Sequence, residues 1–309
     1  MSSDRIHTLA DLDSWRFDGV ALAVLGRPIA HSLSPAMHNA ALADMAGREP
    51  AFAQWRYFKF EIDPRDLAVA LPRFHARGFV GLNLTIPHKI IAVDLVRRID
   101  PAAAEAGAVN TLRRLDAGYE GFNTDGYGVS RAVADDLGLS IAGAPVVLLG
   151  AGGAARAAAV TALREGCSSL WIGNRTSSSL IELVRTLVPI AARSKIKLRG
   201  FDLGNPPPDL PNDALVINAT SVGLKAEDQP PIDLSKVPGQ PRIYDMIYNP
   251  PETPLLRAAK ARQLRAANGI TMLVHQGARA LEIWSDRPVN AAIMQAACQS
   301  ALAANGARD

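Results

Sequence analysis

Apolar residues along the chain form short continuous runs that alternate with segments of helical spacing. The run VALAVL at residues 20–25 ends at a glycine, as a buried strand does, whereas residues 55–62 alternate as a half-buried strand does. On these patterns we expect strands at residues 20–25, 55–62, 79–84, 108–114, 118–122, 145–149, 169–173, 197–201, 214–218 and 242–246. We expect helices at residues 35–45, 64–76, 87–99, 127–137, 154–165, 177–188, 254–265 and 272–304, the last broken at Pro288.

Strands that alternate with helices typically build parallel sheets, so the pattern predicts an α/β fold with two sheets. A chain of 309 residues is long enough for two domains, at roughly 100–200 residues per domain. The first block of the pattern ends at about Asp125, and a new helix begins the second. A hairpin over residues 115–117 is expected to add strands to the first block.

Composition narrows the class of protein. Lys+Arg number 33 and Asp+Glu 30, so the net charge is only +3, and no basic cluster suggests a nucleic-acid partner. The most apolar stretch, residues 144–163, contains glycines and an arginine and is not typical of a membrane span. Cys167 and Cys298 are the only cysteines, which excludes a disulfide framework and a cysteine zinc site. With no secretory signal at the N-terminus, we expect a cytoplasmic protein.

The segment after residues 145–149 has the pattern of a nucleotide-binding turn. It reads G-x-G-x-x-A, with a strand before it and an alanine-rich helix after it. Gly150 permits the tight turn, Gly152 lets the backbone approach a pyrophosphate, and Ala155 allows close packing of helix on strand. The N–H groups at the start of the helix are then available to the phosphates. A glycine-rich turn without a ligand is the alternative.

The end of the next strand indicates which dinucleotide the turn would bind. A site for NAD usually has an acidic residue here for the ribose 2′-hydroxyl, but this chain has Arg175. A guanidinium can hold a 2′-phosphate with charge-assisted hydrogen bonds, so the pattern predicts NADP rather than NAD. The alternative is a solvated arginine at a strand end.

Four polar motifs in the first block follow or adjoin buried strands. In GRPIAHSLSP, Ser32 and Ser34 lie at the carboxyl end of a strand, where open α/β sheets bind ligands. Ser34 is also a candidate N-cap, with Pro35 as the first helical residue. The two interpretations are compatible, because an exposed helix start is a natural carboxylate site.

The other motifs are NLTIPHK, GAVNT and NTDG. In NLTIPHK, Asn83 and Thr85 share one side of the chain, and Lys89 follows in the first turn of a helix, where a cation opposes the helix dipole. We expect the neighbouring His88 to be solvated, and the spacing of the histidines predicts no metal site. In NTDG, Asp125 precedes a helix. Each motif taken alone has a structural alternative.

Taken together and in order, these motifs resemble the shikimate dehydrogenase family. Further matching motifs are NRT, NATSVG, DMIYNP and MLVHQGARALEIW, so that the resemblance spans residues 26–284. It implies a substrate-binding and catalytic domain at residues 1–125, an NADP-binding Rossmann domain at residues 126–268, and C-terminal helices at residues 269–309 that return to the first domain. The first 18 or so residues lie outside the resemblance, and we expect them to pack on the first domain.

The resemblance also implies roles for individual residues. Lys89 and Asp125 would form the catalytic pair, and Ser32 and Ser34 would hold the substrate carboxylate, with Tyr248 near it. Four further residues would bind the ring hydroxyls: Asn83, Thr85, Asn110 and Gln276. The cofactor-binding residues would be Gly150, Ala151, Gly152, Gly153, Ala154, Asn174, Arg175, Thr176, Met246 and Gly269.

The implied activity is the NADPH-dependent, reversible reduction of 3-dehydroshikimate to shikimate. An ammonium group suits this chemistry, because it can donate a proton to the ketone oxygen and stabilise the charge that develops there. The partners would be the small-molecule substrate and NADP, without nucleic acid, membrane or metal, and the protein would be a monomer or a homodimer.

Three alternatives remain. A quinate or dual quinate/shikimate dehydrogenase would use the same scaffold, and the preference for NADP argues against it. A methylene-tetrahydrofolate dehydrogenase would have a similar layout, but the paired serines suit a small carboxylate. A silent ligand sensor would be expected to lack Lys89 or Asp125, and this chain has both.

Overall fold

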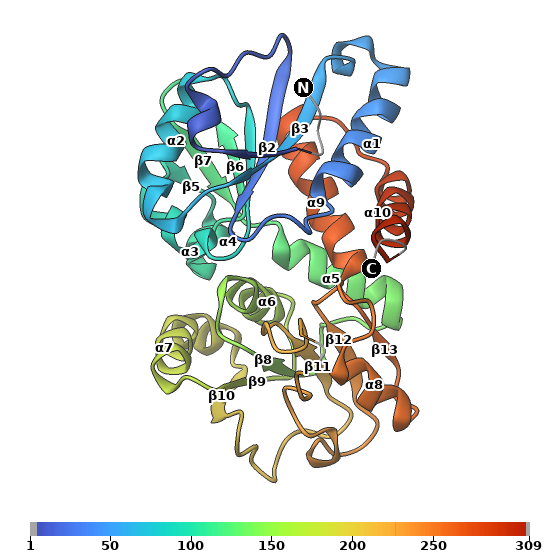
Figure 1. The fold of residues 1–309 in the computed structure, drawn as a ribbon. Coiled ribbons are helices and arrows are strands. Elements are labelled where there is room, and N and C mark those ends of the chain that lie inside the picture. The colour runs from blue at the N-terminus through green and yellow to red at the C-terminus, as the bar shows by residue number, and fades with distance from the viewer. Residues whose placement is uncertain (1–4, 226, 307–309) are drawn as a thin grey trace. The chain divides into compact units, whose positions relative to one another are not determined.

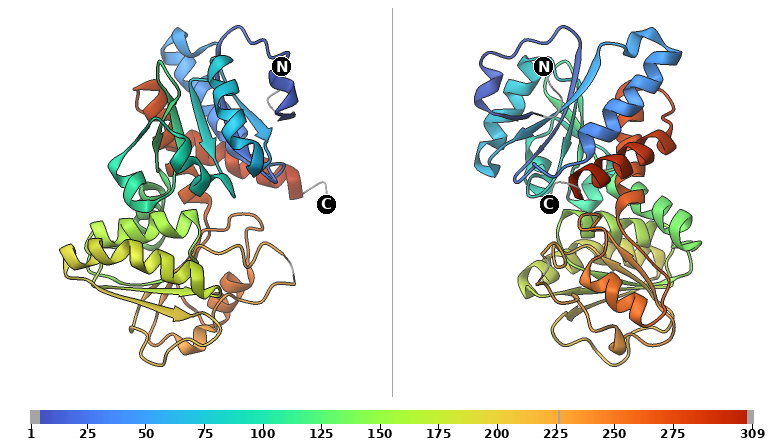
Figure 2. Two further views of the ribbon diagram at one scale, coloured as in Figure 1. Left: turned by 90° about the vertical axis from the view of Figure 1, so that its left-hand side faces the viewer. Right: turned by 45° about the vertical axis from the view of Figure 1, so that its right-hand side comes forward.

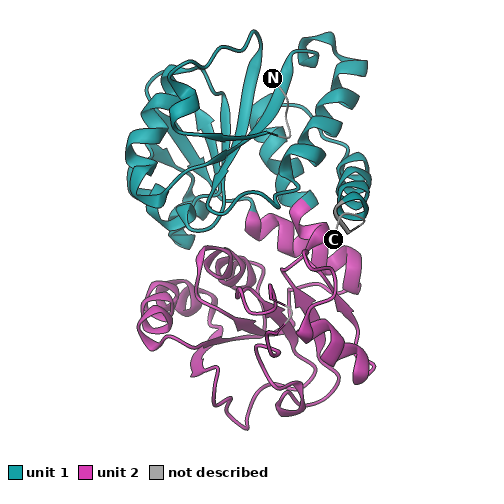
Figure 3. Ribbon diagram, viewed as in Figure 1, with its two compact units in different colours: residues 1–124, 274–309 teal, residues 125–273 magenta. Residues whose placement is uncertain are grey.

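The computed structural model describes residues 5–225 and 227–306 (Figure 1). The chain divides into two compact units: residues 1–124 with 274–309 form unit 1, and residues 125–273 form unit 2 (Figure 3). Each unit has its own β-sheet with helices on its faces, so the predicted α/β class with two sheets is confirmed.

Seven strands of the described residues form the sheet of unit 1, in the order β1-β3-β2-β4-β6-β7-β5. Their bounds are β1 (Ile6–Thr8), β2 (Val20–Gly26), β3 (Trp55–Glu61), β4 (Gly81–Leu84), β5 (Arg98–Ile99), β6 (Thr111–Arg114) and β7 (Tyr119–Phe122). Strands β1 to β4 are parallel, whereas β6 is antiparallel to both β4 and β7. The predicted hairpin is thus present, and it makes this sheet mixed rather than parallel.

Helices cover both faces of this sheet (Figures 1 and 2). The helices of this unit are α1 (Ser34–Arg48), α2 (Leu67–Ala76), α3 (His88–Ile91), α4 (Pro101–Ala106), α9 (Ile270–Ser285) and α10 (Ala291–Gly306), with 3-10 turns η1 (Ala10–Leu12), η2 (Pro50–Phe52), η3 (Pro64–Asp66) and η4 (Ala92–Leu95). Helix α10 packs on α1 rather than on the sheet. Successive side chains of β3 point to opposite faces of the sheet. Phe58 and Phe60 belong to the hydrophobic cluster that includes residues of α2, whereas Tyr57 stacks on His38 of α1.

In unit 1, one predicted helix was much too long and one short helix was missed. The helix expected at residues 87–99 ends at Ile91, because the chain beyond it pairs with β7: Arg97 N–H donates to the carbonyl of Tyr119 at 2.8 Å. The short helix α4 was missed, although it has clear end signals. The Asp100 carboxylate accepts from Ala102 N–H at 2.8 Å, and Gly107 ends the helix in the left-handed conformation at φ 57°.

The N-terminal segment packs on unit 1, as expected. Strand β1 adds a parallel edge to β3, and Leu12 and Trp15 are buried in the same cluster as Phe58 and Phe60. The Trp15 ring meets Phe58 edge-on at 5.0 Å between centroids. This segment is therefore part of the hydrophobic core of unit 1.

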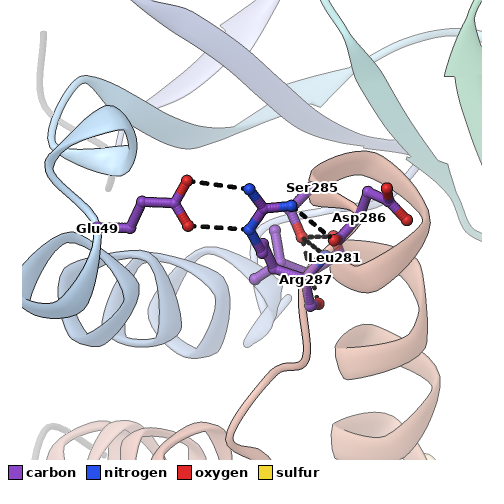
Figure 4. A network of polar contacts seen from close by, with 5 residues as sticks. All are labelled: Glu49, Leu281, Ser285, Asp286 and Arg287. Carbon is purple, nitrogen blue, oxygen red and sulfur yellow. Dashed lines mark hydrogen bonds and ion pairs between the residues drawn. The ribbon is translucent and has the colours of Figure 1, made fainter.

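The C-terminal helices also belong to unit 1, and their break at Pro288 was predicted correctly. Trp284 of α9 lies over Gly81 of β4, where a β-carbon would come within 2.4 Å of the indole, and its Nε1 donates to the carbonyl of Leu112 at 2.9 Å. After α9, Arg287 makes a two-pronged ion pair with Glu49 at the end of α1, at 2.9 and 3.2 Å (Figure 4). These contacts hold the end of α9 and the start of the following loop on unit 1.

Six described strands form the sheet of unit 2, and all neighbouring pairs are parallel. They are β8 (Pro145–Leu149), β9 (Ser169–Asn174), β10 (Lys197–Asp202), β11 (Leu215–Asn218), β12 (Arg242–Asp245) and β13 (Ala266–Ala267). The helices are α5 (Asp125–Leu137), α6 (Gly153–Arg164), α7 (Ser177–Ser194) and α8 (Pro254–Ala261), with the turn η5 (Leu234–Lys236). The helix predicted at residues 254–265 ends at Ala261. Gln263 takes the left-handed conformation at φ 57°, and the chain then pairs with β12 at residues 266–267.

The sheet order β10-β9-β8-β11-β12-β13 means that the chain starts in the middle, moves outward on one side and then returns to build the other. Helices α6 and α7 lie on one face and α8 on the other (Figure 2). This is the doubly wound order, whose ligands bind outside the carboxyl ends of the strands where the direction reverses, here between β8 and β11. Within the described part of the chain, no helix has the length and apolar character needed to cross a membrane.

Candidate active site

The predicted nucleotide turn lies at the reversal point of the unit 2 sheet. Gly150 directly follows β8 and has φ 113°, and a β-carbon there would meet the carbonyl of Ala219 at 2.9 Å. Its N–H donates to the carbonyl of Gly173 at 2.7 Å, which ties the turn to the end of β9. At Gly152, by contrast, a β-carbon would meet nothing within 4 Å. The turn therefore needs glycine at Gly150 for its backbone and leaves open space at Gly152.

Helix α6 begins at Gly153 without a side-chain cap. Its first N–H groups accordingly lack the side-chain acceptor that most helix starts have. Ala155 is fully buried, as the predicted close packing of helix on strand requires. An open backbone at Gly152 and an uncapped helix start together fit a pyrophosphate.

Arg175 is exposed between β9 and α7, at the same edge of the sheet as the glycine turn. The neighbouring Asn174 closes the loop by donating from Nδ2 to the carbonyl of Thr176 at 2.9 Å. An exposed guanidinium beside the turn suits a phosphate on the adenosine ribose.

The two residues predicted near the nicotinamide, Met246 and Gly269, lie against each other. A β-carbon at Gly269 would meet the carbonyl oxygen of Met246 at 2.1 Å, and Gly269 N–H donates to the carbonyl of Ile247 at 3.0 Å. The two segments pack backbone to backbone, which only glycine at position 269 permits. Tyr248 follows in the same loop and is half-buried.

A buried carboxylate holds this loop. Asp245, at the end of β12, is fully buried and accepts hydrogen bonds from Asn218 Nδ2 at 2.9 Å, Ile247 N–H at 3.1 Å and Thr253 Oγ1 at 2.6 Å. Burial raises the pKa of this carboxyl, and the three hydrogen bonds oppose only part of the rise. Asp245 thus joins the loops that follow β11 and β12.

In unit 1, the motif with the paired serines forms a loop between β2 and α1. Ser34 is the first residue of α1, and the N-cap position is Leu33, which has no side-chain cap. The N-cap alternative for Ser34 is therefore wrong; instead, the Ser32 hydroxyl accepts from Ser34 N–H at 3.3 Å. Both hydroxyls belong to the same turn, with Ser32 half-buried and Ser34 only 7% exposed.

Side chains from three separate motifs meet at the end of β4. Asn83 Nδ2 donates to the carbonyl of Asn110 at 3.1 Å and to Thr111 Oγ1 at 3.0 Å. The Asn110 carboxamide in turn accepts from Thr124 N–H at 2.8 Å, and its Nδ2 lies 3.4 Å from Gln276 Oε1. Three predicted substrate residues, Asn83, Asn110 and Gln276, are thus joined in one hydrogen-bond network.

Thr85 and Lys89 lie just beyond this network. A β-carbon at Gly26 would meet the Thr85 methyl group at 2.3 Å, so that Thr85 sits beside the start of the loop with Ser32 and Ser34. Lys89 is half-buried in α3, and its carbonyl accepts from Val109 N–H at 2.8 Å. The other member of the predicted pair, Asp125, is buried at the start of α5 and belongs to unit 2.

Sequence reasoning missed three residues of the unit 1 network. Thr111 and Thr124 belong to the GAVNT and NTDG motifs, where they are direct neighbours of Asn110 and Asp125. Their positions could therefore have indicated that they belong to the site. Tyr57, which donates to Asn83 Oδ1 at 2.7 Å, gave no signal beyond its place in an alternating strand. The expectation of a solvated His88 was wrong: its side chain is fully buried, and this burial lowers its pKa.

Among the residues that the structure describes, no group of three or more His, Cys, Asp or Glu side chains is arranged to hold a metal ion. The strand order of unit 2 and its glycine turn define the class: a protein with a Rossmann dinucleotide-binding unit. The family follows from comparison with known proteins. Residues 24–112 match the model of the shikimate dehydrogenase substrate binding domain, and residues 269–299 match that of the shikimate 5'-dehydrogenase C-terminal domain.

The chain is 40% identical to shikimate dehydrogenase (NADP(+)) of Geobacter metallireducens, over 91% of this chain and 96% of the relative. Among solved structures, shikimate 5-dehydrogenase of Thermus thermophilus, in complex with NADP(H) and shikimate, is 33% identical with a TM-score of 0.76, covering 92% of this chain and all of the other. The ligand-free 5-ketofructose reductase of a Gluconobacter strain is 30% identical with a TM-score of 0.77, covering 92% of this chain and 99% of the other. The chain belongs to the shikimate dehydrogenase family.

Proposed function

We propose that this protein is a shikimate dehydrogenase, an NADP-dependent oxidoreductase that interconverts 3-dehydroshikimate and shikimate. The observation that carries the proposal is the hydrogen-bond network of the buried Asn83 and Asn110 with the half-buried Gln276, at the carboxyl end of β4. It occurs in a chain 40% identical to a shikimate dehydrogenase over 91% of its length. Unit 1 would bind the substrate and unit 2 the cofactor, close to the predicted domain ranges.

The residues of unit 2 fit NADP. The open backbone at Gly152 and the uncapped start of α6 suit a pyrophosphate held by residues 150–154, and the exposed Arg175, with Asn174 and Thr176, suits a 2′-phosphate. Met246 and Gly269 would border the nicotinamide. When bound, the cofactor supplies the hydride.

Unit 1 would recognise a small carboxylate that carries ring hydroxyls. The hydroxyls of Ser32 and Ser34 would donate to the carboxylate, with Tyr248 nearby. Amide and hydroxyl groups would bind the ring hydroxyls: Asn83, Thr85, Asn110 and Gln276. A site of buried amides discriminates strongly against ligands that lack the matching hydroxyls, since unmatched groups would stay buried without a partner.

Lys89 and Asp125 would move the proton. Reduction of the ketone places negative charge on its oxygen, and a lysine ammonium can donate a proton there while stabilising that charge. The Asp125 carboxylate would orient the ammonium and accept a hydrogen bond from the substrate. In this proposal the two groups would titrate as one coupled pair.

A different reductase of the same fold is the main rival, because the 5-ketofructose reductase is 30% identical over nearly the whole chain. The curated relatives are named shikimate dehydrogenase (NADP(+)), which disfavours the quinate alternative. The cytoplasmic location, and the protein's being a monomer or a homodimer, stay predictions.

One set of assays tests the proposal. Initial rates with shikimate, quinate and the reduced sugar product of 5-ketofructose should be compared, each with NADP⁺ and with NAD⁺. We expect the highest kcat/KM for shikimate with NADP⁺. A higher kcat/KM for either of the other substrates would reassign the substrate, and a higher one with NAD⁺ would reassign the cofactor.

A further inference from the structure

Tyr57 adjoins the network of proposed substrate-binding residues through its hydrogen bond to Asn83, and no motif of the sequence indicated it. It is a residue of β3, and its side chain is fully buried. We propose that Tyr57 is a positioning residue, whose hydroxyl fixes the orientation of the Asn83 carboxamide for substrate binding. This inference rests on the proposed function and adds to it a residue that touches neither substrate nor cofactor.

The contacts of Asn83 show how its orientation is fixed. Its Nδ2 uses both hydrogens, one toward the carbonyl of Asn110 at 3.1 Å and one toward Thr111 Oγ1 at 3.0 Å. Its Oδ1 accepts from the Tyr57 hydroxyl at 2.7 Å. A flipped carboxamide would set its oxygen against the Asn110 carbonyl, so the three bonds select one orientation. The second lone pair of Oδ1 is then the acceptor that Asn83 can present to a substrate hydroxyl.

The hydroxyl of Tyr57 is itself held in place through its ring and backbone. The Asn39 side chain accepts from Tyr57 N–H and donates to the Tyr57 carbonyl, both at 2.9 Å. The His38 ring stacks on the Tyr57 ring with centroids 4.1 Å apart and planes 3° from parallel. Because α1 supplies both contacts and also begins with Ser34, Tyr57 connects the carboxylate-binding turn with the amide network.

Tyr57 acts as a hydrogen-bond donor throughout the working range of pH. Burial raises the pKa of its phenol, and the nearby Ser34 hydroxyl opposes only part of that rise. A neutral phenol has one proton to donate, and the geometry directs it to Asn83. Without that proton, the Asn83 carboxamide loses one of the three hydrogen bonds that fix its orientation. Ordering the carboxamide would then cost free energy when the substrate binds.

The test is the variant Tyr57→Phe, which removes one oxygen and keeps the ring. We expect the KM for shikimate to rise about three- to tenfold, the usual effect of one buried hydrogen bond, while the KM for NADP⁺ and kcat change less than about twofold. The matched control is Tyr119→Phe. Tyr119 is another buried tyrosine of unit 1, and its hydroxyl donates to the carbonyl of Phe79 at 3.1 Å, outside the network. Both variants should lower the melting temperature, but only Tyr57→Phe should change the KM for shikimate.

A double-mutant cycle with Asn83→Ala tests whether Tyr57 acts through Asn83. In the Asn83→Ala background, Tyr57→Phe should raise the KM for shikimate no further. Independent, multiplying effects on KM would overturn the proposal, and so would equal KM changes in Tyr57→Phe and Tyr119→Phe. If Asn83→Ala does not fold, the comparison of the two phenylalanine variants decides. A wild-type protein that neither binds nor oxidises shikimate would overturn the proposed function, and with it this inference.

Discussion

At the scale of single residues, Lys89 lies in the short helix α3, and its carbonyl accepts from the N–H of Val109, the residue before Asn110 of the network. Replacing it by alanine removes the proposed proton donor. We expect Lys89→Ala to lower kcat by about 10²–10⁴-fold with little change in the KM for NADP⁺. Steady-state kinetics measures both quantities, and a near-wild-type kcat would exclude Lys89 from the chemistry.

Arg175 is the residue that we propose to set the preference for NADP over NAD. Because its guanidinium is exposed at the edge that carries the glycine turn, Arg175→Ala should raise the KM for NADP⁺ and leave the KM for NAD⁺ nearly unchanged. The loss of charge-assisted hydrogen bonds corresponds to a rise of about ten- to a hundredfold in the KM for NADP⁺. Arg185, which is exposed on α7, provides the matched control. Equal effects of Arg175→Ala on both cofactors would contradict the assignment.

Asp245 makes stability depend on pH. Because burial raises the pKa of its carboxyl in the folded protein, the folded chain holds a proton that the unfolded chain releases at the same pH. Its contribution to the free energy of unfolding is therefore fully present below the ordinary carboxyl pKa of about 3.9 and declines as pH rises through the raised value. Asp245→Asn does not titrate, so its stability relative to wild type should increase from about pH 4 upward.

Urea unfolding of both proteins at a series of pH values measures this difference. The Oδ1 of the asparagine can still accept from Ile247 N–H. Loss of the other hydrogen bonds would change the free energy of unfolding by the same amount at every pH, so only the titration of Asp245 makes the difference between the two proteins depend on pH. A difference between the two proteins that stays constant with pH would show that Asp245 keeps an ordinary carboxyl titration.

At the scale of elements, the contact between β4 and α9 sets the position of the network. Gly81 leaves room for the indole of Trp284, and a β-carbon would come within 2.4 Å of it. We expect Gly81→Ala to destabilise unit 1 by about 1–3 kcal/mol, the usual cost of overpacking. The control is Gly47→Ala in α1, where a β-carbon meets nothing within 4 Å, and helix propensity predicts a gain of about 0.5–1 kcal/mol.

Urea unfolding compares the two alanine variants. If Gly81→Ala were as stable as wild type, the indole of Trp284 could move away from the new β-carbon without loss of stability. The contact between Gly81 and Trp284 would then not determine the position of α9. Since Gln276 stands on the same helix, a displaced α9 should also raise the KM for shikimate.

Some helices and strands could be predicted from the local sequence pattern alone, and others could not. Strand β8, the glycine turn and α6 were predicted to within a residue, because period, glycine conformation and helix propensity are local properties. The segment at residues 87–99 was not, because its pairing with β7 outweighs its helical spacing. The fold class, the hairpin and the break at Pro288 were predicted; the mixed sheet, α4 and the edge strands β1 and β13 were not.

At the scale of the whole molecule, the N-terminal segment lies outside the matched part of the substrate binding domain, which begins at residue 24. Trp15 is 4% exposed among Phe58, Phe60 and Phe79, so Trp15→Ala would leave a large cavity. We expect a loss of about 3–5 kcal/mol in the stability of unit 1, measured by urea unfolding, with the KM for NADP⁺ unchanged. Ser14→Ala, at the exposed neighbour, is the control, and equal stability of both variants would show that the segment adds nothing to the core.

The sequence by itself determined what depends on neighbours along the chain: the alternation of strands and helices, the glycine turn, the arginine after β9 and the motifs that place the chain in its family. Only the tertiary structure decided that Asn83, Asn110 and Gln276 share hydrogen bonds, that His88 is buried, and that Tyr57 stands behind Asn83. These facts arise from packing between segments far apart in the chain. A local pattern cannot specify them, because burial and hydrogen-bond partners depend on which distant side chain fills the adjoining space.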